Sequence, residues 1–131
     1  MAEREKRRVM RRNAIPLAVH GLIEYGLGVL FILAPFLFSF DTDAPTVLSA
    51  LLGAAILVMA VLTDAPTGLS RTLPLASHIV LDYVISVFLI ASPFLFGFSD
   101  DDPALAFFLV TGVGYLLMTV GTRYRKQDTP A

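Results

Sequence analysis

An internal repeat constrains the fold of this chain more than any other feature. Residues 15–40 align without a gap on residues 73–98, offset by 58 positions, and 12 of the 26 paired positions are identical. Each copy has a proline and a histidine near its start and a Pro-Phe-Leu-Phe-x-Phe run near its end. Repetition of a sequence segment indicates repetition of a structural unit. We therefore expect two tandem copies of one small architecture.

The apolar composition predicts that this architecture lies in a membrane. Hydrophobic residues make up 56% of the chain and charged residues 16%, and the mean hydropathy is +0.73. Typical soluble domains have about 25% charged residues. The apolar runs lie at residues 15–40, 47–62, 74–98 and 104–120, separated by acidic turns at 41–46 and 99–103 and a polar connection. A helix of about 20 residues spans the roughly 30 Å core of a bilayer.

We accordingly predict an all-α membrane protein with four transmembrane helices, arranged as two tandem, parallel-oriented helical hairpin repeats. The predicted division is a basic tail at 1–14, a first two-helix repeat at 15–63, a connection at 64–73, a second repeat at 74–122 and a tail at 123–131. All ten Lys and Arg fall in the two tails or the connection, and five aspartates fall in the two other turns. The positive-inside rule places both termini in the cytoplasm.

Composition also narrows the chemistry. The chain has no cysteine, which excludes disulfides, thiolate metal sites and a cysteine nucleophile. The basic tail at 1–14 is not accompanied by aromatic residues or a folded scaffold, so we expect contact with anionic lipid rather than nucleic acid. No nucleophile with a base and an orienting group is visible in the sequence, and we expect neither an enzyme nor a cofactor. The expected partners are the lipid bilayer and either a second copy or a larger membrane complex.

Ionisable residues recur at equivalent positions inside the apolar runs. His20 and Glu24 are four residues apart and thus share one helix face, and His78 and Asp82 repeat the pattern. Intramembrane carboxylates are costly, and they mark a functional site by default. The candidate polar cluster is His20, Glu24, Tyr25, His78, Asp82 and Tyr83.

Three interpretations of this cluster stay open. In the first, His–carboxylate pairs and the two tyrosine hydroxyls join the halves and fix their packing. In the second, two carboxylates and two imidazoles form a proton or cation pathway. In the third, His20, Glu24, His78 and Asp82 hold a metal ion, or the two histidines ligate a haem.

Other polar and small residues have simpler predicted roles. The pairs Pro35-Phe36 and Pro93-Phe94 are expected to end a helix with aromatic side chains at the membrane interface. The acidic turns are expected to be solvated caps, with residues 100–102 a weak candidate for Ca²⁺. The glycines at 112, 114 and 121 are expected to let helices approach closely.

The Pro-Phe elements, with the Leu-Phe-x-Phe that follows each, resemble the SPW-repeat family of small integral membrane proteins. Phe36 and Phe94 stand where the family motif has Trp, and Ala34 replaces its Ser in the first copy. The His-x-x-x-Glu/Asp-Tyr elements are similar to one branch of that family. The resemblance covers about residues 15–122 and implies a four-helix protein of the bacterial or archaeal plasma membrane. It implies no activity. We therefore predict a structural or accessory component, with a small proton- or cation-conducting or metal- or haem-binding protein as the alternative.

Overall fold

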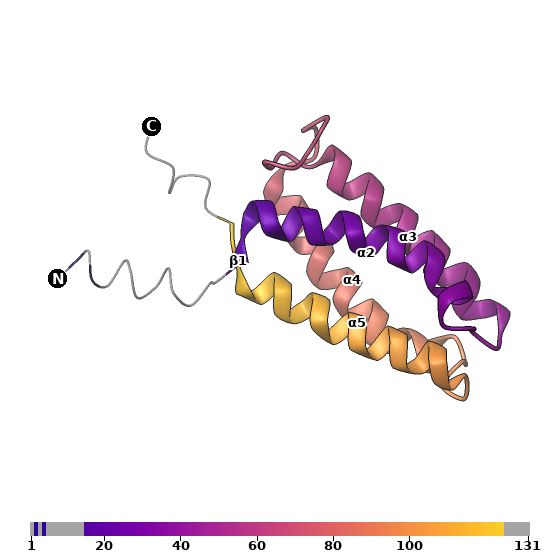
Figure 1. Cartoon of the computed structure of the whole chain (residues 1–131). Helices are drawn as coiled ribbons and strands as arrows, with labels where there is room; N and C mark the ends of the chain where they lie inside the picture. The colour runs from indigo at the N-terminus through magenta and orange to yellow at the C-terminus, as the bar shows by residue number, and fades with distance from the viewer. Residues whose placement is uncertain (1, 3, 5–14, 125–131) are drawn as a thin grey trace.

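Four long helices form one bundle in the computed structural model, which describes residues 2, 4 and 15–124 (Figure 1). The elements are β1 (Ile15–Pro16), α2 (Leu17–Leu37), α3 (Asp43–Leu62), α4 (Leu75–Leu95), α5 (Asp102–Gly121) and β2 (Thr122–Arg123). All four helices are long and apolar enough to cross a membrane. The predicted all-α, four-helix membrane architecture is thus confirmed. Most of the tails predicted at 1–14 and 123–131 lies outside the described residues.

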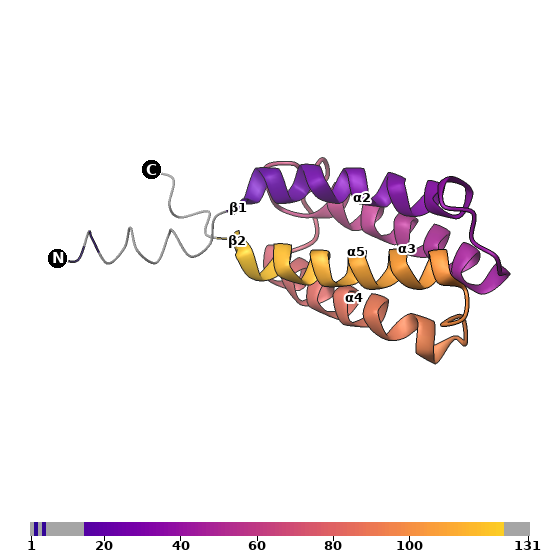
Figure 2. The same cartoon turned by 60° about the horizontal axis from the view of Figure 1, so that its bottom comes forward.

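The helices are paired as two hairpins that point the same way. Helix α2 packs along α3 and α4 packs along α5. Figure 2 shows that β1, β2 and the connection between α3 and α4 lie at one end of the bundle, and that the two short turns lie at the other. We call these the β end and the turn end. The two repeats therefore have the same orientation, as the charge distribution predicted.

The β end is closed by two equivalent short strand contacts. Strand β1 pairs in parallel with β2, Ile15 opposite Thr122. An equivalent parallel bridge joins Thr63, after α3, to Leu73, before α4. In both cases the residue before a first helix pairs with the residue after the second helix of the other hairpin. This exchange brings the ends of α3 and α5 against the starts of α4 and α2.

The second helices start earlier than predicted. Helix α3 begins at Asp43 rather than Val47, and α5 begins at Asp102 rather than Ala104. A proline in the first turn does not break a helix, because the backbone N–H it lacks has no intrahelical partner there. Consequently Pro45 and Pro103 lie inside helices. Helices α2 and α4 are offset by 58 residues but α3 and α5 by 59, because the second turn is one residue longer.

The repeated prolines lie in the last turn of their helices. Pro35 is within α2, which ends at Leu37, and Pro93 occupies the same place in α4. Proline lacks the N–H that would bond to the carbonyl four residues earlier. In the first repeat the hydroxyl of Ser49 donates to that carbonyl, on Phe31, and so ties α3 to α2. The neighbouring Phe36 and Phe94 are 77% and 64% exposed at the turn end.

A close approach of α2 and α3 requires two glycines. A Cβ atom on Gly53 would lie 2.6 Å from the carbonyl oxygen of Gly28, and one on Gly28 would lie 2.5 Å from Leu57. Gly112 makes the equivalent contact between α5 and α4, at 2.8 Å from Ile90. Gly114 does not, since nothing lies within 4 Å of its Cβ position. Within the bundle, Gly114 therefore does not serve a close approach of two helices.

The bundle interior towards the turn end is apolar and aromatic. Phe31, Leu89 and Phe108 are all 0% exposed. Phe31 packs against Phe107 with ring centroids 4.9 Å apart and an interplanar angle of 63°. Edge-to-face contacts of this kind contribute beyond the burial of area. The outer faces of the helices are apolar as well. The polar cluster predicted from the sequence lies between this apolar core and the β end.

One acidic turn does not fit the prediction of a solvated cap. Asp101 is only 3% exposed. Its carboxylate accepts from the backbone N–H groups of Asp41 and Thr42, both at 3.0 Å, and from the Thr42 hydroxyl at 2.8 Å. It also caps α5 by accepting from the N–H of Ala104. Asp101 therefore joins the turns of the two hairpins, which its sequence context did not predict.

Candidate functional site: a buried histidine–carboxylate quartet

Four ionisable side chains from α2 and α4 meet inside the β end of the bundle. They are His20, Glu24, His78 and Asp82, which we call the quartet. Their exposed fractions are 1%, 0%, 5% and 0%. The i to i+4 spacing places each histidine and its carboxylate on one helix face. Contacts between the side chains of the two helices show that both faces turn toward each other.

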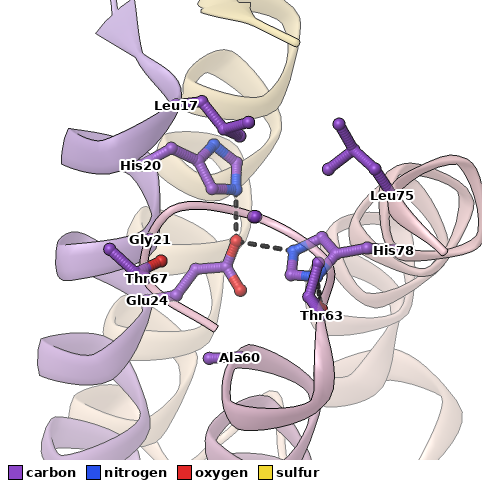
Figure 3. A pocket seen from close by; sticks show the side chains of 10 residues that line it. Leu17, His20, Gly21, Glu24, Ala60, Thr63, Thr67, Leu75 and His78 are labelled. Atoms are coloured by element: carbon purple, nitrogen blue, oxygen red, sulfur yellow. Dashed lines mark hydrogen bonds and ion pairs between the residues drawn. The ribbon is translucent and has the colours of Figure 1, made fainter. Parts of the chain in front are cut away.

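The quartet closes into a ring of four polar atoms. Nε2 of His20 lies 3.0 Å from Oδ2 of Asp82 and contacts Oε1 of Glu24. Nε2 of His78 lies 2.8 Å from the same Glu24 oxygen and 3.1 Å from the same Asp82 oxygen. Each imidazole thus faces both carboxylates, and each carboxylate faces both imidazoles. Figure 3 shows the Glu24 oxygen between the two rings.

Two threonines hold the outer nitrogens of the histidines. Nδ1 of His20 lies 2.8 Å from Oγ1 of Thr122, and Nδ1 of His78 contacts Oγ1 of Thr63. Both hydroxyls donate their own proton to a backbone carbonyl four residues earlier, on Met118 and Met59 respectively.

A hydroxyl whose proton is already donated can only accept a further hydrogen bond. Nδ1 of each histidine is therefore the N–H donor to its threonine. Nε2 is then the nitrogen whose proton or lone pair points into the quartet. Both threonines belong to the opposite hairpin, so each imidazole connects the hairpins through both of its nitrogens.

The remaining oxygens of the two carboxylates differ in their hydrogen bonding. Oδ1 of Asp82 accepts a hydrogen bond of 2.7 Å from the hydroxyl of Tyr115, which is 2% exposed. Oε2 of Glu24 is buried and has no hydrogen-bond partner among the described residues. The register of 59 residues between α3 and α5 places Ile56 at the position equivalent to Tyr115. An isoleucine cannot donate a hydrogen bond, so Glu24 has no counterpart of the Tyr115 hydroxyl.

The tyrosines predicted to join the quartet lie elsewhere. Tyr25 donates from its hydroxyl to the carbonyl of Thr67, 2.9 Å away in the connection between the hairpins. Tyr83 is 39% exposed on the bundle surface. Each tyrosine directly follows the carboxylate residue of its repeat in the sequence. Successive residues on a helix point about 100° apart, so each tyrosine side chain points away from that carboxylate. The expectation that these hydroxyls bond across the two halves is not met, and the tyrosine that reaches the quartet is Tyr115, which bonds Asp82 within its own hairpin.

Tyr124 covers the quartet at the β end, beyond the membrane-spanning segments. Its ring packs against that of His20 with centroids 5.7 Å apart. Burial raises the pKa of the Tyr124 hydroxyl, and the nearby charge of Asp82 raises this pKa further. The hydroxyl therefore stays neutral at physiological pH. A small pocket also borders the quartet between Leu17, Thr67 and Leu75, with room for about one water molecule.

The space between the imidazoles is too filled for a haem. The two rings have centroids 6.0 Å apart, and an oxygen from each carboxylate lies between their Nε2 atoms. A porphyrin between axial histidines would have to displace both carboxylates. The geometry instead suits either an ion-paired network or a single bound cation.

Comparison with known families identifies the chain. A family model described as the SPW repeat domain matches residues 18–122, which is most of the sequence. The chain belongs to the SPW repeat family. The match includes both hairpins, and therefore also the quartet and both Pro-Phe elements of this SPW repeat protein. Neither the comparison with curated proteins nor the comparison with solved structures gives a match.

Proposed function

We propose that this SPW repeat protein is a structural or accessory component of its membrane, without catalytic activity of its own. The observation that carries the proposal is the closure of the quartet across the two hairpins. Both histidines bond to the other hairpin on both ring nitrogens. Polar contacts between buried helices stabilise one specific packing, because their alternative in lipid is an unpaired polar group.

A charge balance supports the structural role. Two imidazolium groups and two carboxylates sum to zero, so the quartet can be fully ionised without leaving net charge in the bilayer. Isolated charges at such depth would be strongly unfavourable. The same balance would be lost if any one of the four residues were made neutral. The ionised side chains of each hairpin are therefore stable in the bilayer only when the other hairpin is in place.

The core favours this role over proton or cation conduction. A conduction path requires water or polar groups on both sides of the quartet. Towards the turn end the quartet is followed by Phe31, Leu89 and Phe108, all fully buried apolar side chains. On the other side the adjoining pocket has room for about one water molecule. An ion would meet a dry, low-dielectric barrier beyond the quartet.

The orientation that we infer has both termini and the connection at 64–73 in the cytoplasm of a bacterium or archaeon, with the protein in the plasma membrane. The support is the charge distribution, since all basic residues of the sequence precede the first span, follow the fourth or lie between the second and third. Within this orientation the quartet lies near the cytoplasmic side, and Asp101 joins the turns on the outer side.

The partner surface that we propose is the lipid-facing exterior, where a second copy or a larger membrane complex would dock. Gly26 and Gly114 lie on this exterior, and nothing comes within 4 Å of a Cβ built on either. Small residues on membrane helices allow close approach of another helix. The absence of a large described segment outside the four spans is consistent with an accessory role.

Native mass spectrometry in a mild detergent, together with pull-down from the native membrane, tests this function. We expect a defined oligomer or a reproducible membrane partner. Recovery of a lone monomer without partners would contradict an accessory role. Proteoliposomes provide the matched test of the alternative. We expect no more proton or cation flux than in protein-free liposomes, and flux that the double variant Glu24→Gln, Asp82→Asn abolishes would replace the proposal with conduction.

A further inference from the structure

The quartet has one feature that an ion-paired network leaves unexplained. Oε2 of Glu24 is buried without a partner among the described residues, although Glu24 itself is 0% exposed. A buried carboxylate oxygen without a hydrogen bond is unfavourable, and it indicates an unseen water, ion or ligand. The pocket that borders the quartet is lined by Glu24, His20 and His78. The unpartnered oxygen therefore belongs to a site with room beside it.

The four residues also supply a convergent set of ligand atoms. One ligand atom from each of His20, Glu24, His78 and Asp82 can be chosen so that all lie within 4.8 Å of one another. The donors come from two helices that their hairpins hold in fixed register. Two imidazole nitrogens and two carboxylate oxygens form a donor set that suits Zn²⁺ and neighbouring first-row divalent ions. Ca²⁺ and Mg²⁺ prefer oxygen ligands alone.

The surrounding hydrogen bonds are those of a metal centre. A histidine that binds a metal usually donates its other ring N–H to a fixed acceptor, which sets the tautomer and the orientation of the ring. Thr122 and Thr63 accept from Nδ1 of His20 and His78, and so direct both Nε2 atoms inward. Tyr115 holds Asp82 in the same manner, through the oxygen that faces away from the imidazoles.

From these observations we propose that His20, Glu24, His78 and Asp82 bind one divalent transition-metal ion, with Zn²⁺ the best fit. Nε2 of each histidine and one oxygen of each carboxylate are the ligands, and Thr63, Thr122 and Tyr115 are positioning residues. The site goes beyond the structural function proposed above, because an ion-paired quartet can join the hairpins without a metal.

Size and charge are compatible with this assignment. Three of the four nitrogen–oxygen separations around the ring are 2.8–3.1 Å, and the fourth, between Nε2 of His20 and Oε1 of Glu24, is shorter. Tetrahedral zinc with bonds of about 2.0–2.1 Å would separate its ligand atoms by roughly 3.4 Å. The first three sides would have to widen by a few tenths of an ångström, and the His20–Glu24 side by more, which rotation of the Glu24 side chain can supply. Two carboxylates balance the charge of a divalent ion, so the occupied site is neutral within the bilayer.

Metal analysis of the purified protein tests the site directly. The protein is produced with an affinity tag that contains no histidine, extracted in mild detergent without chelator, and measured by inductively coupled plasma mass spectrometry. After chelator treatment it is titrated with Co²⁺, whose visible absorption bands report four-coordinate binding. We expect about one equivalent of metal per chain and a saturable Co²⁺ spectrum that Zn²⁺ abolishes.

Variants locate the binding. Glu24→Gln should abolish stoichiometric binding, whereas Thr63→Val should keep the site and lower the affinity about 10- to 100-fold. Asp101→Asn is the matched control, because it neutralises an equally buried carboxylate at the opposite end of the bundle and should leave the Co²⁺ titration unchanged. Far-UV circular dichroism verifies the helical fold of each variant. If Glu24→Gln does not fold, the graded loss in Thr63→Val still tests the site.

Two outcomes would overturn the metal site. One is a wild-type protein that binds neither its own metal nor added Co²⁺ or Zn²⁺. The other is metal binding that is the same in wild type, Glu24→Gln and Thr63→Val, because the ion would then be bound elsewhere. Either result leaves the structural function standing, since that function is tested by partners and by the coupling between the hairpins.

Discussion

Neutralising Asp82 should unfold the bundle more readily than any other single charge removal in the described part of the chain. Its carboxylate faces His20 at 3.0 Å, His78 at 3.1 Å and Tyr115 at 2.7 Å, and the residue is 0% exposed. In Asp82→Asn the shape is kept and the charge is lost, so the effect does not arise from a cavity. Removal of one partner from a buried ion pair costs about 3–5 kcal/mol. We expect a loss in the free energy of unfolding within that range.

The assay is reversible unfolding in mixed micelles of a mild detergent and sodium dodecyl sulfate, followed by far-UV circular dichroism. Asp100→Asn is the control, because the same chemical change is made at an exposed aspartate of the outer turn. Exposed substitutions of this type stay within about 0.5 kcal/mol of wild type. If Asp82→Asn also stays within about 0.5 kcal/mol, the quartet does not hold the bundle together. Glu24→Gln should fall between the two, because only one of its oxygens has partners.

Three further predictions concern other contacts. Tyr115→Phe removes one hydrogen bond to a charged group and should lower the free energy of unfolding by about 1.5–3 kcal/mol in the same assay, whereas a change below 0.5 kcal/mol would show that the contact is not energetically significant. Gly53→Leu should destabilise the bundle by at least 1–3 kcal/mol through overpacking; Gly26→Leu, which meets no neighbour, should not, and equal effects would contradict the packing. Because the chain has no cysteine, Ser70→Cys and Asp100→Cys can be labelled with an impermeant maleimide. The Asp100→Cys variant should react in intact cells and the Ser70→Cys variant only after lysis, and the reverse pattern would contradict the proposed topology.

Much of the fold could be predicted because it depends on local properties of the chain. Four apolar runs of membrane-spanning length and a gapless repeat were sufficient to predict two hairpins in one orientation. The starts of α3 and α5 were misplaced because Pro45 and Pro103 were treated as turn residues, whereas the first turn of a helix accepts proline. The single-residue difference between the two turns was hidden by the same prolines, which are offset by 58 residues as the first helices are.

The candidate site could be predicted only in part, because some of its residues are close in the sequence and others come from distant segments. The i to i+4 spacing of each histidine and carboxylate is local, and the structure brings all four together. The residues that position them come from distant segments, since Thr122 follows His20 by 102 residues and Tyr115 follows Asp82 by 33. Tyr115 has no counterpart in the first repeat, so the repeat could not indicate it. A signal for the threonines did exist, because both directly follow the end of a second helix.

The contact of Asp101 at the turn end could not be predicted from the local sequence. A run of three aspartates in a polar turn is typical of a solvated segment. The middle one, Asp101, is nevertheless buried because the turn of the other hairpin offers it two backbone N–H groups and a hydroxyl. Only the packing of the hairpins brings these donors close to Asp101. The acidic residue is therefore part of the junction between the repeats and not only a determinant of orientation.

The coupling free energy between His20 and Asp82 decides whether the quartet joins the two hairpins, because these residues belong to different hairpins and meet only if the quartet forms. A double-mutant cycle with His20→Gln, Asp82→Asn and the combined variant isolates that coupling from the cost of each change. We expect the combined variant to be more stable than the sum of the single losses implies, by about 1 kcal/mol or more. Additive losses, with a coupling indistinguishable from zero, would contradict this expectation.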